Sequence, residues 1–518
     1  MILPRPAHLV AEAGEFVIGP QVPLAAGPGT ERAAAVLART LGPARSRTEA
    51  GCGAVRLEIE VASARPPQSY ELVIRPDGVR LTAPDEAGLF NGVQSLRQLL
   101  RPAAEAEPGA PDDNWRLPCL TVRDEPSVQW RGVLLDVARR FLPLEYLFEF
   151  VDLLALHKLN VMQLHLTDDQ GWRIEIDGLP ELTEVGAMRT ESMLGPAGCG
   201  RFDGTPHGGF YTQDELRSLV AHAADRGVTI VPEIGVPGHV QALLAAYPEL
   251  GNDPDRRLPV WTEWGISEHI LGVHDEVFEV LETILDQVLE VFPSPFVHIG
   301  GDECPTVEWE ASPQGRAKAR ELGLASPALL YGWFLSRVQK ILAERGRRAI
   351  SWAEAELHGD LDPGLVLMAW LDPAHGARAV GRGHQVLMSP HKTTYFDYPQ
   401  SDDPAEPQGN PEEVVTLADV YGFDPLEGAL SAVDLRDSDA GVLGAQAALW
   451  TEHVQSVEHA RYLLLPRLCA FAEAAWSSEV RDSADFERRL GSHLSRLQDA
   501  GMTARTPIAA GHGGTAAA

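Results

Sequence analysis

The sequence predicts an α/β protein in which a small N-terminal α/β domain precedes a closed (β/α)8 barrel, the TIM barrel. Short, continuous apolar runs recur through the middle of the chain, and helix-like segments separate most of them. Polar or aromatic residues end these runs. Continuous apolar strands that alternate with amphipathic helices are typical of a parallel sheet. Eight such strands favour a closed barrel, whose active sites gather at the C-terminal strand ends.

The eight expected strands lie in the runs "RGVLLDVAR", "LNVMQLHLTDD", "VTIVPEIGVPGH", "PFVHIGGDE", "RRAISWAE", "LVLMAW", "HQVLMSPHKTTYFDY" and "VLGAQAALWTE". Helices are expected between them, in "LEYLFEFVDLLALHK", "TQDELRSLVAHAADRG", "EVFEVLETILDQVLEVF" and "ALLYGWFLSRVQKILAERG". An open doubly wound sheet is the alternative architecture. The chain has no GxGxxG or P-loop motif that would support a nucleotide-binding version of it.

The first part of the chain has the pattern of a separate unit. "SYELVIRPDGVRLTA" contains two strand-like runs around Pro76, Asp77 and Gly78, which is a hairpin signal. In the following "EAGLFNGVQSLRQLL", apolar residues recur on one helical face, at Leu89, Val93, Leu96 and Leu100. An N-terminal domain of antiparallel strands and helices is therefore expected.

The predicted domain limits follow from composition. "RPAAEAEPGAPDDN" is rich in proline, alanine and acid, and is expected to be an exposed connection. We place the N-terminal domain at residues 1–124 and the barrel at residues 125–500. Residues 501–518 are of low complexity and are expected to form a disordered tail.

Charge and composition narrow the possible partners. The net charge of -31 argues against nucleic acid, because binding to nucleic acid depends on Lys and Arg neutralising phosphates. No apolar stretch is long enough to span a membrane. The start, "MILPRPAHLVAEAGEF", lacks the basic end and apolar core of a secretion signal, so a cytoplasmic location is expected. The five cysteines are scattered without CxxC spacing, which suggests neither a disulfide framework nor a zinc site.

Two adjacent carboxylates, Asp302 and Glu303, follow the apolar run of the fourth expected strand. Gly300 and Gly301 precede them and allow the backbone to bend there. An isolated Asp-Glu pair is usually a solvated surface pair. At the mouth of a barrel strand, the same pair can reach two neighbouring atoms of one substrate.

The other expected strand ends carry an unusual number of polar and aromatic residues: Arg131, Asp168, Asp169, His239, Trp352, Trp370, Tyr395, Asp397, Trp450 and Glu452. A single Trp more often belongs to the core than to a binding site. Three at successive strand ends, with acids beside them, suggest a carbohydrate pocket, because sugars have apolar CH faces and many hydroxyls. His239, Asp168 and Asp302 could in principle bind a metal, but without an HxH or HExxH pair we expect neither metal nor cofactor.

These residues carry a resemblance to a known family. The motifs "HIGGDECP", "RGVLLDVAR", "LHLTDDQGWR", "VPEIGVPGH" and "LWTEH" resemble signatures of family 20 β-N-acetylhexosaminidases. The similarity covers nearly the whole chain, since "YELVIRPDGVRLTAPDEAGLFNGVQSLRQLL" resembles the family's N-terminal domain and "LLLPRLCAFAEAAWSS" its last barrel helix. The resemblance implies removal of terminal β-linked GlcNAc or GalNAc from non-reducing ends.

The resemblance also implies roles for the candidate residues. Family 20 enzymes are substrate-assisted glycosidases, in which the 2-acetamido oxygen of the sugar attacks the anomeric carbon and forms an oxazolinium ion. By resemblance, Glu303 is the general acid and then the base, and Asp302 orients and stabilises the acetamido group. Tyr395 would bind the acetamido oxygen, and Asp168 and His239 would form a relay to Glu303. The binding residues would be Trp352, Trp370 and Trp450 around the N-acetyl group, and Arg131, Asp397 and Glu452 at the ring hydroxyls.

The chain departs from the family pattern at two places. Gly235 stands in "EIGVPGH" where the family usually has Asp in "EIDMPGH", so a contact near His239 is expected to be missing. The segment after the seventh strand contains no Trp, which weakens the case for chitooligosaccharide binding beyond the cleaved sugar. A catalytically silent sugar-binding protein and a two-carboxylate glycosidase remain alternatives. The sequence does not predict the natural substrate or the oligomeric state.

Overall fold

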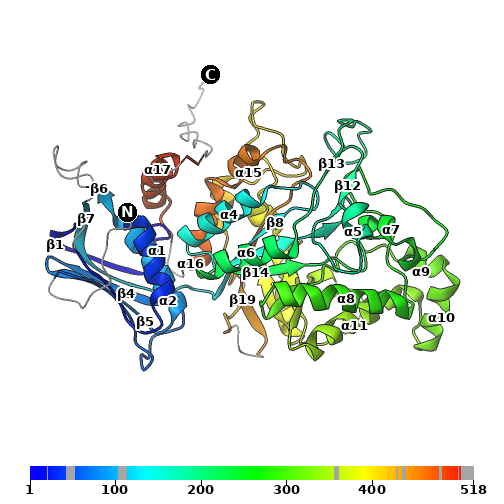
Figure 1. Cartoon of the computed structure of the whole chain (residues 1–518), viewed down its shortest axis with the longest axis horizontal. Coiled ribbons are helices and arrows are strands. Elements are labelled where there is room, and N and C mark those ends of the chain that lie inside the picture. Colours follow the sequence, from blue (N-terminus) through cyan, green and yellow to red (C-terminus); the bar gives the residue numbers. More distant parts are fainter. Residues whose placement is uncertain are drawn as a thin grey trace, which may run out of the picture.

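A computed structural model shows a small N-terminal domain beside a larger barrel (Figure 1). The structure describes residues 1–19, 22–41, 53–102, 114–354, 361–427, 430–434, 439–477, 481–499 and 501–502. Most of the predicted tail, residues 503–518, and most of the predicted connection around residues 103–113 lie outside the described residues.

The N-terminal domain is built on a seven-stranded sheet with strand order β1-β7-β4-β5-β3-β2, in which β6 pairs with β7. The strands are β1 (His8–Ile18), β2 (Leu24–Ala26), β3 (Val55–Ile59), β4 (Tyr70–Arg75), β5 (Gly78–Ala83), β6 (Arg101–Pro102) and β7 (Trp115–Asp124). The expected hairpin is β4 and β5, which pair with Arg75 opposite Gly78. The sheet is mainly antiparallel, but β3 pairs in parallel with both β2 and β5.

Two helices cover one face of this sheet, α1 (Glu31–Leu41) and α2 (Glu86–Leu99). The helix α2 begins at Asp85, whose Oδ1 accepts the N–H of Gly88 at 2.8 Å, a typical N-cap. The expected apolar face is buried at Leu89, Val93 and Leu96, all 0% exposed. Gly88 allows the helix to pack closely, because a Cβ there would lie 2.1 Å from the carbonyl oxygen of Ser69.

The eight expected barrel strands are all present and close on each other in the order β14-β15-β16-β17-β18-β19-β8-β9. They are β8 (Trp130–Asp136), β9 (Val161–His165), β14 (Thr229–Glu233), β15 (Phe296–His298), β16 (Arg348–Trp352), β17 (Val366–Ala369), β18 (Gln385–Met388) and β19 (Gly441–Leu449). Neighbouring strands are parallel, as in the pairing of β19 with β8. The prediction of a (β/α)8 barrel is confirmed, and the open-sheet alternative is wrong.

The expected barrel helices are α4 (Leu144–Leu156), α6 (Gln213–Ala224), α8 (Asp275–Val291) and α11 (Leu330–Glu344). The start of α6 is a capping box, in which Thr212 and Glu215 satisfy each other's backbone N–H groups. The remaining elements are α5 (Glu181–Glu184), α7 (Gln241–Ala246), α9 (Val307–Ala311), α10 (Pro313–Glu321), α12 (Pro373–Gly381), α13 (His391–Thr394), α14 (Leu417–Gly422), α15 (Val457–Leu464), α16 (Arg467–Trp476), α17 (Ser483–Asp499), the 3-10 turns Pro248–Leu250 and Pro327–Leu329, and the short strands β10 (Thr167–Asp168), β11 (Gly171–Trp172), β12 (Met188–Arg189) and β13 (His207–Gly208).

A buried polar cluster joins the two domains. Lys158, between α4 and β9, pairs through Nζ with Asp124 Oδ2 at 2.8 Å, and both side chains are fully buried. Trp476, the last residue of α16, donates its Nε1–H to Asp124 Oδ1 at 2.9 Å. Because Lys158 precedes β9, the N-terminal domain packs at the amino ends of the barrel strands, opposite the ends where a barrel enzyme keeps its active site.

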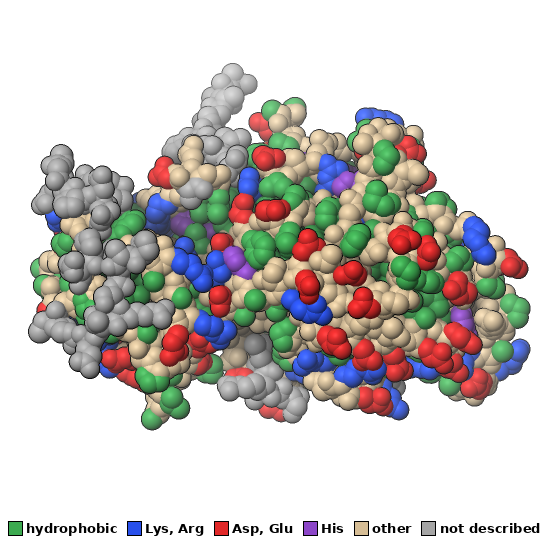
Figure 2. All heavy atoms as spheres, viewed as in Figure 1, with side chains coloured by type: hydrophobic (Ala, Val, Ile, Leu, Met, Phe, Trp, Pro, Cys, Tyr) green, Lys and Arg blue, Asp and Glu red, His purple; other side chains and the backbone are tan. Residues whose placement is uncertain are grey.

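Acidic side chains outnumber basic ones in the chain, 74 Asp and Glu against 43 Lys and Arg. On the face drawn in Figure 2, Asp and Glu side chains are spread over the barrel, with Lys and Arg side chains among them. A net charge of -31 disfavours the binding of polyanions. In the described part of the chain, helices that combine the length and the hydropathy needed to cross a bilayer are absent.

Candidate active site

The loop after β15 presents the two adjacent carboxylates at the carboxyl ends of the barrel strands. Its backbone enters the left-handed region at Gly300 (φ 68°), Gly301 (φ 89°) and Glu303 (φ 44°). A Cβ on Gly300 would lie 2.8 Å from the Cα of Gly235, so glycine is needed there for both backbone shape and space. A non-glycine residue in this region costs about 1–3 kcal/mol and is often found at functional sites.

Asp302 and Glu303 line a cavity of about 420 Å³. The same cavity is lined by most of the other predicted site residues: Trp352, Trp370, Tyr395, Asp397, Trp450 and Glu452. They come from the ends of β16, β17, β18 and β19. The structure therefore brings together side chains from four strands that are neighbours in the barrel.

The aromatic side chains enclose part of this cavity. The ring of Trp352 lies 5.9 Å from that of Trp450 and 6.5 Å from that of Trp370, measured between centroids. Trp370 is stacked with Tyr395 at 6.2 Å and an interplanar angle of 9°. Trp352 is buried, whereas Trp370 and Trp450 are half-buried and so offer ring surface to a ligand. Such rings suit the apolar faces of a sugar and its N-acetyl methyl.

His239 lies behind the two acids and connects them to further carboxylates. Its Nε2 is 3.4 Å from Glu303 Oε2 and 4.0 Å from Asp302 Oδ2. Its Nδ1 is 3.0 Å from Asp169 Oδ2 and 3.3 Å from Asp168 Oδ1. Burial alone would lower the pKa of His239, but the carboxylates around it, Asp168 first, raise its pKa well above the usual value. The imidazole is therefore a cation that faces Glu303.

The relay expected from Asp168 to His239 thus includes a second acid. Asp169, which the sequence placed at the same strand end but outside the candidate relay, makes the shorter contact to His239. Gly235 offers no side chain to His239, but His239 Nδ1 has the carboxylates of Asp168 and Asp169 within 3.3 Å. At Gly235 the nearest atom to an added Cβ is 3.7 Å away, so a side chain could begin there without a clash.

Burial and neighbouring charge distinguish Asp302 from an ordinary aspartate. Burial, together with the nearby carboxylate of Glu303, raises the pKa of Asp302 to about 6, while His239 opposes the rise. Glu354 lies just after β16. Its burial, together with the negative charges of Asp302 and Glu303, raises its pKa to about 8. The Oε2 of Glu354 accepts the Nε1–H of Trp370 at 3.3 Å. Sequence reasoning missed Glu354, although it follows the fifth strand as closely as other candidates follow theirs.

The arginine at this site is Arg139, and sequence reasoning missed it. Its guanidinium lies 2.8 Å from Asp168 Oδ2, 3.2 Å from Asp136 Oδ2 and 3.7 Å from Glu452 Oε1, and it is 5.1 Å from the ring of Trp450. Arg139 lines the cavity, and its side chain is 8% exposed.

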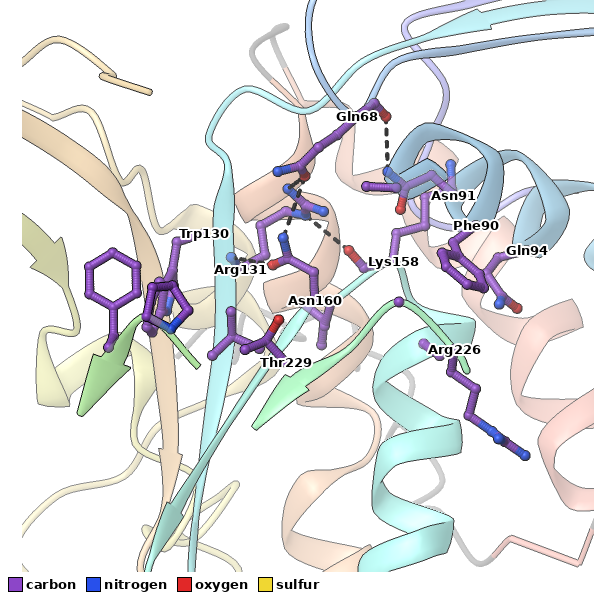
Figure 3. A pocket seen from close by; sticks show the side chains of 17 residues that line it. Gln68, Phe90, Asn91, Gln94, Trp130, Arg131, Lys158, Asn160, Arg226 and Thr229 are labelled. Carbon is purple, nitrogen blue, oxygen red and sulfur yellow. Dashed lines mark hydrogen bonds between the residues drawn. The ribbon is translucent and has the colours of Figure 1, made fainter. Parts of the chain in front are cut away.

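The expectation that Arg131 binds ring hydroxyls is wrong. Arg131 lies at the amino end of β8, whereas the site lies at the carboxyl ends. Its guanidinium donates to Gln68 Oε1 and to the carbonyl oxygens of Val128, Gln129 and Lys158, all at 2.8–3.1 Å. Figure 3 shows it beside Gln68 and Asn160, in a cavity of about 240 Å³ between the domains. Arg131 therefore holds the N-terminal domain to the barrel.

Two further acids of the cavity, Asp397 and Glu452, have raised pKa values. Burial and the neighbouring Glu452 raise the pKa of Asp397 to about 8. Burial also raises the pKa of Glu452, although Arg139 opposes this. A carboxyl that carries a proton near pH 7 can both donate and accept a hydrogen bond, which suits a sugar hydroxyl.

Three side chains behind the cavity are close enough together to bind a metal ion, but cationic side chains of the protein already contact one of them, Asp168. Ligand atoms of Asp168, Asp169 and His239 lie within 4.8 Å of one another. Asp168 Oδ2 already contacts Arg139 at 2.8 Å and His165 Nε2 at 2.9 Å. Arg139 and His239, with the other neighbouring cations, keep the pKa of Asp168 well below its usual range despite its burial.

The mouth of the cavity contains an aromatic residue that the motif comparison did not anticipate. The segment after the seventh strand has no Trp, but Trp264 and Ile266, from the loop after α7, line the cavity instead. Trp264 is 6% exposed, whereas Ile266 is 47% exposed. Trp264 and Ile266 therefore add apolar lining to the cavity from a different loop.

The cavity with its adjacent carboxylates and aromatic rings lies at the carboxyl end of a closed barrel, which is where barrel enzymes have their active sites. Residues 128–479 match the glycosyl hydrolase family 20 catalytic domain, and residues 1–125 match domain 2 of the same family. The chain belongs to glycosyl hydrolase family 20, as its motifs predicted.

Known proteins are similar over most of the chain. It is 37% identical to a beta-hexosaminidase of Porphyromonas gingivalis over 88% of this chain and 57% of that protein. It is 34% identical to a beta-hexosaminidase of Akkermansia muciniphila over 82% of this chain and 83% of that protein. The chain therefore spans less than two thirds of the first of these relatives.

Solved structures agree in fold. A family 20 exo-beta-N-acetylglucosaminidase from Vibrio harveyi, in complex with N-acetylglucosamine, superposes with a TM-score of 0.86 at 30% identity and covers 98% of this chain and 78% of that chain. A mutant beta-hexosaminidase of Streptomyces plicatus in complex with its product GlcNAc has a TM-score of 0.82 at 29% identity, over 98% of this chain and 96% of that chain.

Proposed function

We propose that this protein is a retaining exo-β-N-acetylhexosaminidase, which removes terminal β-linked GlcNAc or GalNAc from non-reducing ends by substrate-assisted catalysis. The observation that carries the proposal is the position of Asp302 and Glu303, adjacent in the chain and lining one aromatic cavity. The names of the relatives and the GlcNAc found in similar structures support the choice of sugar.

Adjacent acids suit a mechanism in which the substrate supplies the nucleophile. A conventional retaining glycosidase needs two carboxyl groups on opposite sides of the scissile bond, about 5–5.5 Å apart. Asp302 and Glu303 are consecutive and line the same part of the cavity. In the proposed mechanism they reach neighbouring atoms of one sugar, which are the leaving oxygen and the acetamido nitrogen.

In the first step, the acetamido oxygen attacks the anomeric carbon while Glu303 transfers its proton to the leaving oxygen. The bond to the leaving group breaks and an oxazolinium ion forms. Asp302, as a carboxylate, accepts the acetamido N–H and balances the positive charge on that nitrogen. Tyr395 donates its O–H to the acetamido oxygen. In the second step, Glu303 removes a proton from water, and the water opens the oxazolinium ion with net retention.

His239 influences the proton on Glu303. A cation 3.4 Å from Glu303 Oε2 stabilises the carboxylate formed when the proton leaves. Asp168 and Asp169 in turn keep His239 charged and fix its ring. In place of the predicted Arg131, we assign Arg139 to the ring hydroxyls, together with Asp397 and Glu452, because all three line the cavity.

The test is hydrolysis of chromogenic aryl glycosides by the purified protein. We expect release of the aglycone from β-GlcNAc and β-GalNAc glycosides and no measurable release from the β-glucoside, which lacks the acetamido group. A thiazoline analogue of the oxazolinium ion should inhibit the enzyme strongly. Equal rates on the glucoside, or a covalent sugar ester trapped on Asp302 or Glu303, would contradict the mechanism. If no aglycone is released from any of the glycosides, the alternative of a catalytically silent sugar-binding protein is favoured.

A panel of natural β-hexosaminides would then identify the substrate among chitobiose, peptidoglycan fragments and glycans. Release of a single sugar from the non-reducing end at each turnover would support the exo mode.

A further inference from the structure

Glu233, the last residue of β14, is a fully buried carboxylate behind the aromatic cavity. Its Oε2 accepts the Nε2–H of Gln163 at 2.7 Å and lies 2.8 Å from His165 Nδ1. Its Oε1 accepts the Nε1–H of Trp352 at 3.2 Å, and His298 Nδ1 lies 3.0 Å away. None of the roles proposed above involves this acid, although four side-chain nitrogen atoms surround it.

These contacts keep Glu233 ionised inside the barrel. Burial alone would raise the pKa of Glu233, but His165 and His298 outweigh burial and hold the pKa well below its usual value. An unpaired buried charge is very costly, so the partners of Glu233 are constrained to remain in place around it.

The first of these partners is an aromatic residue of the cavity. Trp352 is 1% exposed, and its Nε1–H bond to Glu233 fixes the rotation of the indole. The opposite side of Trp352 belongs to the cavity lining, where its ring is 5.9 Å from that of Trp450. The orientation of the cavity wall therefore depends on a carboxylate outside the cavity.

The second partner leads to the general acid. His165 has a carboxylate at each ring nitrogen, with Glu233 at Nδ1 (2.8 Å) and Asp168 at Nε2 (2.9 Å). The ring of His165 also packs edge-on against Trp450 at 5.1 Å. Asp168 contacts His239, which faces Glu303, so the contacts from Glu233 continue to the acid.

We propose that Glu233 is a positioning residue of the reaction, which holds Trp352 directly, and Trp450 and Asp168 through His165, in the arrangement that orients the N-acetyl group for attack. The inference rests on the proposed function, since it concerns the same cavity and the same acetamido arm. Its chemistry is specific to a carboxylate, because a neutral amide at this position would turn an N–H group toward nitrogen donors.

The first experiment is the substitution Glu233→Gln, which keeps the shape of the side chain. Misplacement of a positioning contact typically costs about 10²-fold in rate, so kcat with an aryl β-GlcNAc substrate should fall about 10²-fold, with a smaller change in KM. The preference for N-acetyl over N-propanoyl substrates should also decrease, because the walls around the methyl group are no longer fixed.

Gln163→Leu is the matched control. Gln163 donates to the same carboxylate at 2.7 Å, so its loss should lower the melting temperature, but it leaves the Trp352 and His165 contacts intact. Its kcat, KM and acyl preference should remain those of the wild type. If Glu233→Gln is folded and also keeps wild-type kcat and acyl preference, Glu233 contributes only stability and the proposal is wrong.

A double-mutant cycle tests the route through Trp352. Trp352→Phe removes the N–H donor and keeps an aromatic ring, so Glu233→Gln should cost less in that background than in the wild type. If the two substitutions instead lower kcat by independent factors that multiply in the double variant, Glu233 does not act through Trp352. A crystal structure of Glu233→Gln provides a readout without turnover, because the indole of Trp352 should rotate from its wild-type orientation. If the wild type hydrolyses no β-hexosaminide, the proposed function fails, and this structure still decides whether Glu233 holds Trp352.

Discussion

Replacing Arg139 by glutamine should weaken both the fold and the reaction. The Arg139 side chain, 8% exposed, lies within 3.7 Å of three carboxylates, those of Asp136, Asp168 and Glu452. Removing one partner of a buried ion pair costs about 3–5 kcal/mol of stability, because the remaining charge is left unpaired. The pKa of Asp168 should rise once its strongest cationic neighbour is lost, and its hold on His239 should weaken.

The expected loss in kcat/KM can be estimated from the energy of one hydrogen bond. A hydrogen bond from a charged donor contributes about 1.5–3 kcal/mol, and each 1.36 kcal/mol is tenfold in rate. If Arg139 binds a ring hydroxyl, kcat/KM of the folded Arg139→Gln enzyme should fall about ten- to a hundredfold. Arg139→Lys retains the charge without the planar fork, so it should recover stability more than activity.

The matched variant is Arg131→Gln. Arg131 is also buried, but its contacts are carbonyl oxygens and Gln68 at the amino end of the barrel. Its melting temperature should fall, while kcat/KM of the folded protein stays within about threefold, less than 0.7 kcal/mol. Thermal melts with kinetics on an aryl β-GlcNAc substrate separate the two. If Arg131→Gln loses as much kcat/KM as Arg139→Gln while folded, the assignment of Arg139 is refuted.

Four further changes test the site. Glu303→Gln should lower activity on a disaccharide by about 10²–10⁴-fold, the usual range for a general acid, and less on activated aryl substrates; equal disaccharide rates would exclude Glu303. Because the pKa of Asp302 is raised to about 6, kcat/KM should rise with pH up to about that value and then level, and Asp302→Asn should slow the reaction and remove this limb. The folded protein holds a proton on Asp302 more tightly than the unfolded chain does. The contribution of Asp302 to the free energy of unfolding should therefore decrease as pH rises from the pKa of the unfolded chain to about 6, which pH-dependent melts would show. Trp370→Ala should lower kcat, raise KM and relax the acyl preference; a folded variant with unchanged kinetics would place Trp370 outside the acetamido pocket. Glu354→Gln should be nearly silent at pH 6, since burial raises the pKa of Glu354 to about 8 and the carboxyl is already neutral, so a tenfold loss there would contradict the assigned protonation state.

Much of the fold could be predicted from periodicity alone. The strands are buried on both faces, as in β8 and β19, where every residue is buried, so each appears in the sequence as a continuous apolar run. Their number and alternation with helices suffice for a barrel. The N-terminal domain was less predictable, because the parallel pairing of β3 with β2 and β5 depends on contacts between segments distant in sequence.

The candidate site was predictable where its residues directly follow a strand. Asp302, Trp370 and Glu452 come after such runs and line the cavity. The same rule separates the two arginines, since Arg131 precedes the apolar run of β8 and Arg139 follows it. The direction of β8 therefore places Arg139, and not Arg131, at the carboxyl end of the barrel. The predicted domain limits, the tail and the cytoplasmic location stay predictions.

Buried polar partners could not be predicted in the same way. Glu233 and His165 stand inside apolar runs, and an acid in such a run gives no sign of the cation that will neutralise it. The partners of Glu233 come from β9, β15 and β16, which meet only when the barrel closes. A charge network of this kind is a property of the closed sheet, so it is visible only once the strand order is known.

Backbone conformation adds a last argument that residue types alone cannot supply. His239 (φ 54°) and Glu303 (φ 44°) both occupy the left-handed region, which glycine adopts without strain. Each costs about 1–3 kcal/mol there, and such strain persists only where the surrounding structure holds it. The side chains of these two residues are in contact, with His239 Nε2 3.4 Å from Glu303 Oε2. Both residues of this contact therefore have a strained backbone. We expect this if the two loops are held in the conformation that brings the imidazole of His239 to the proposed general acid Glu303.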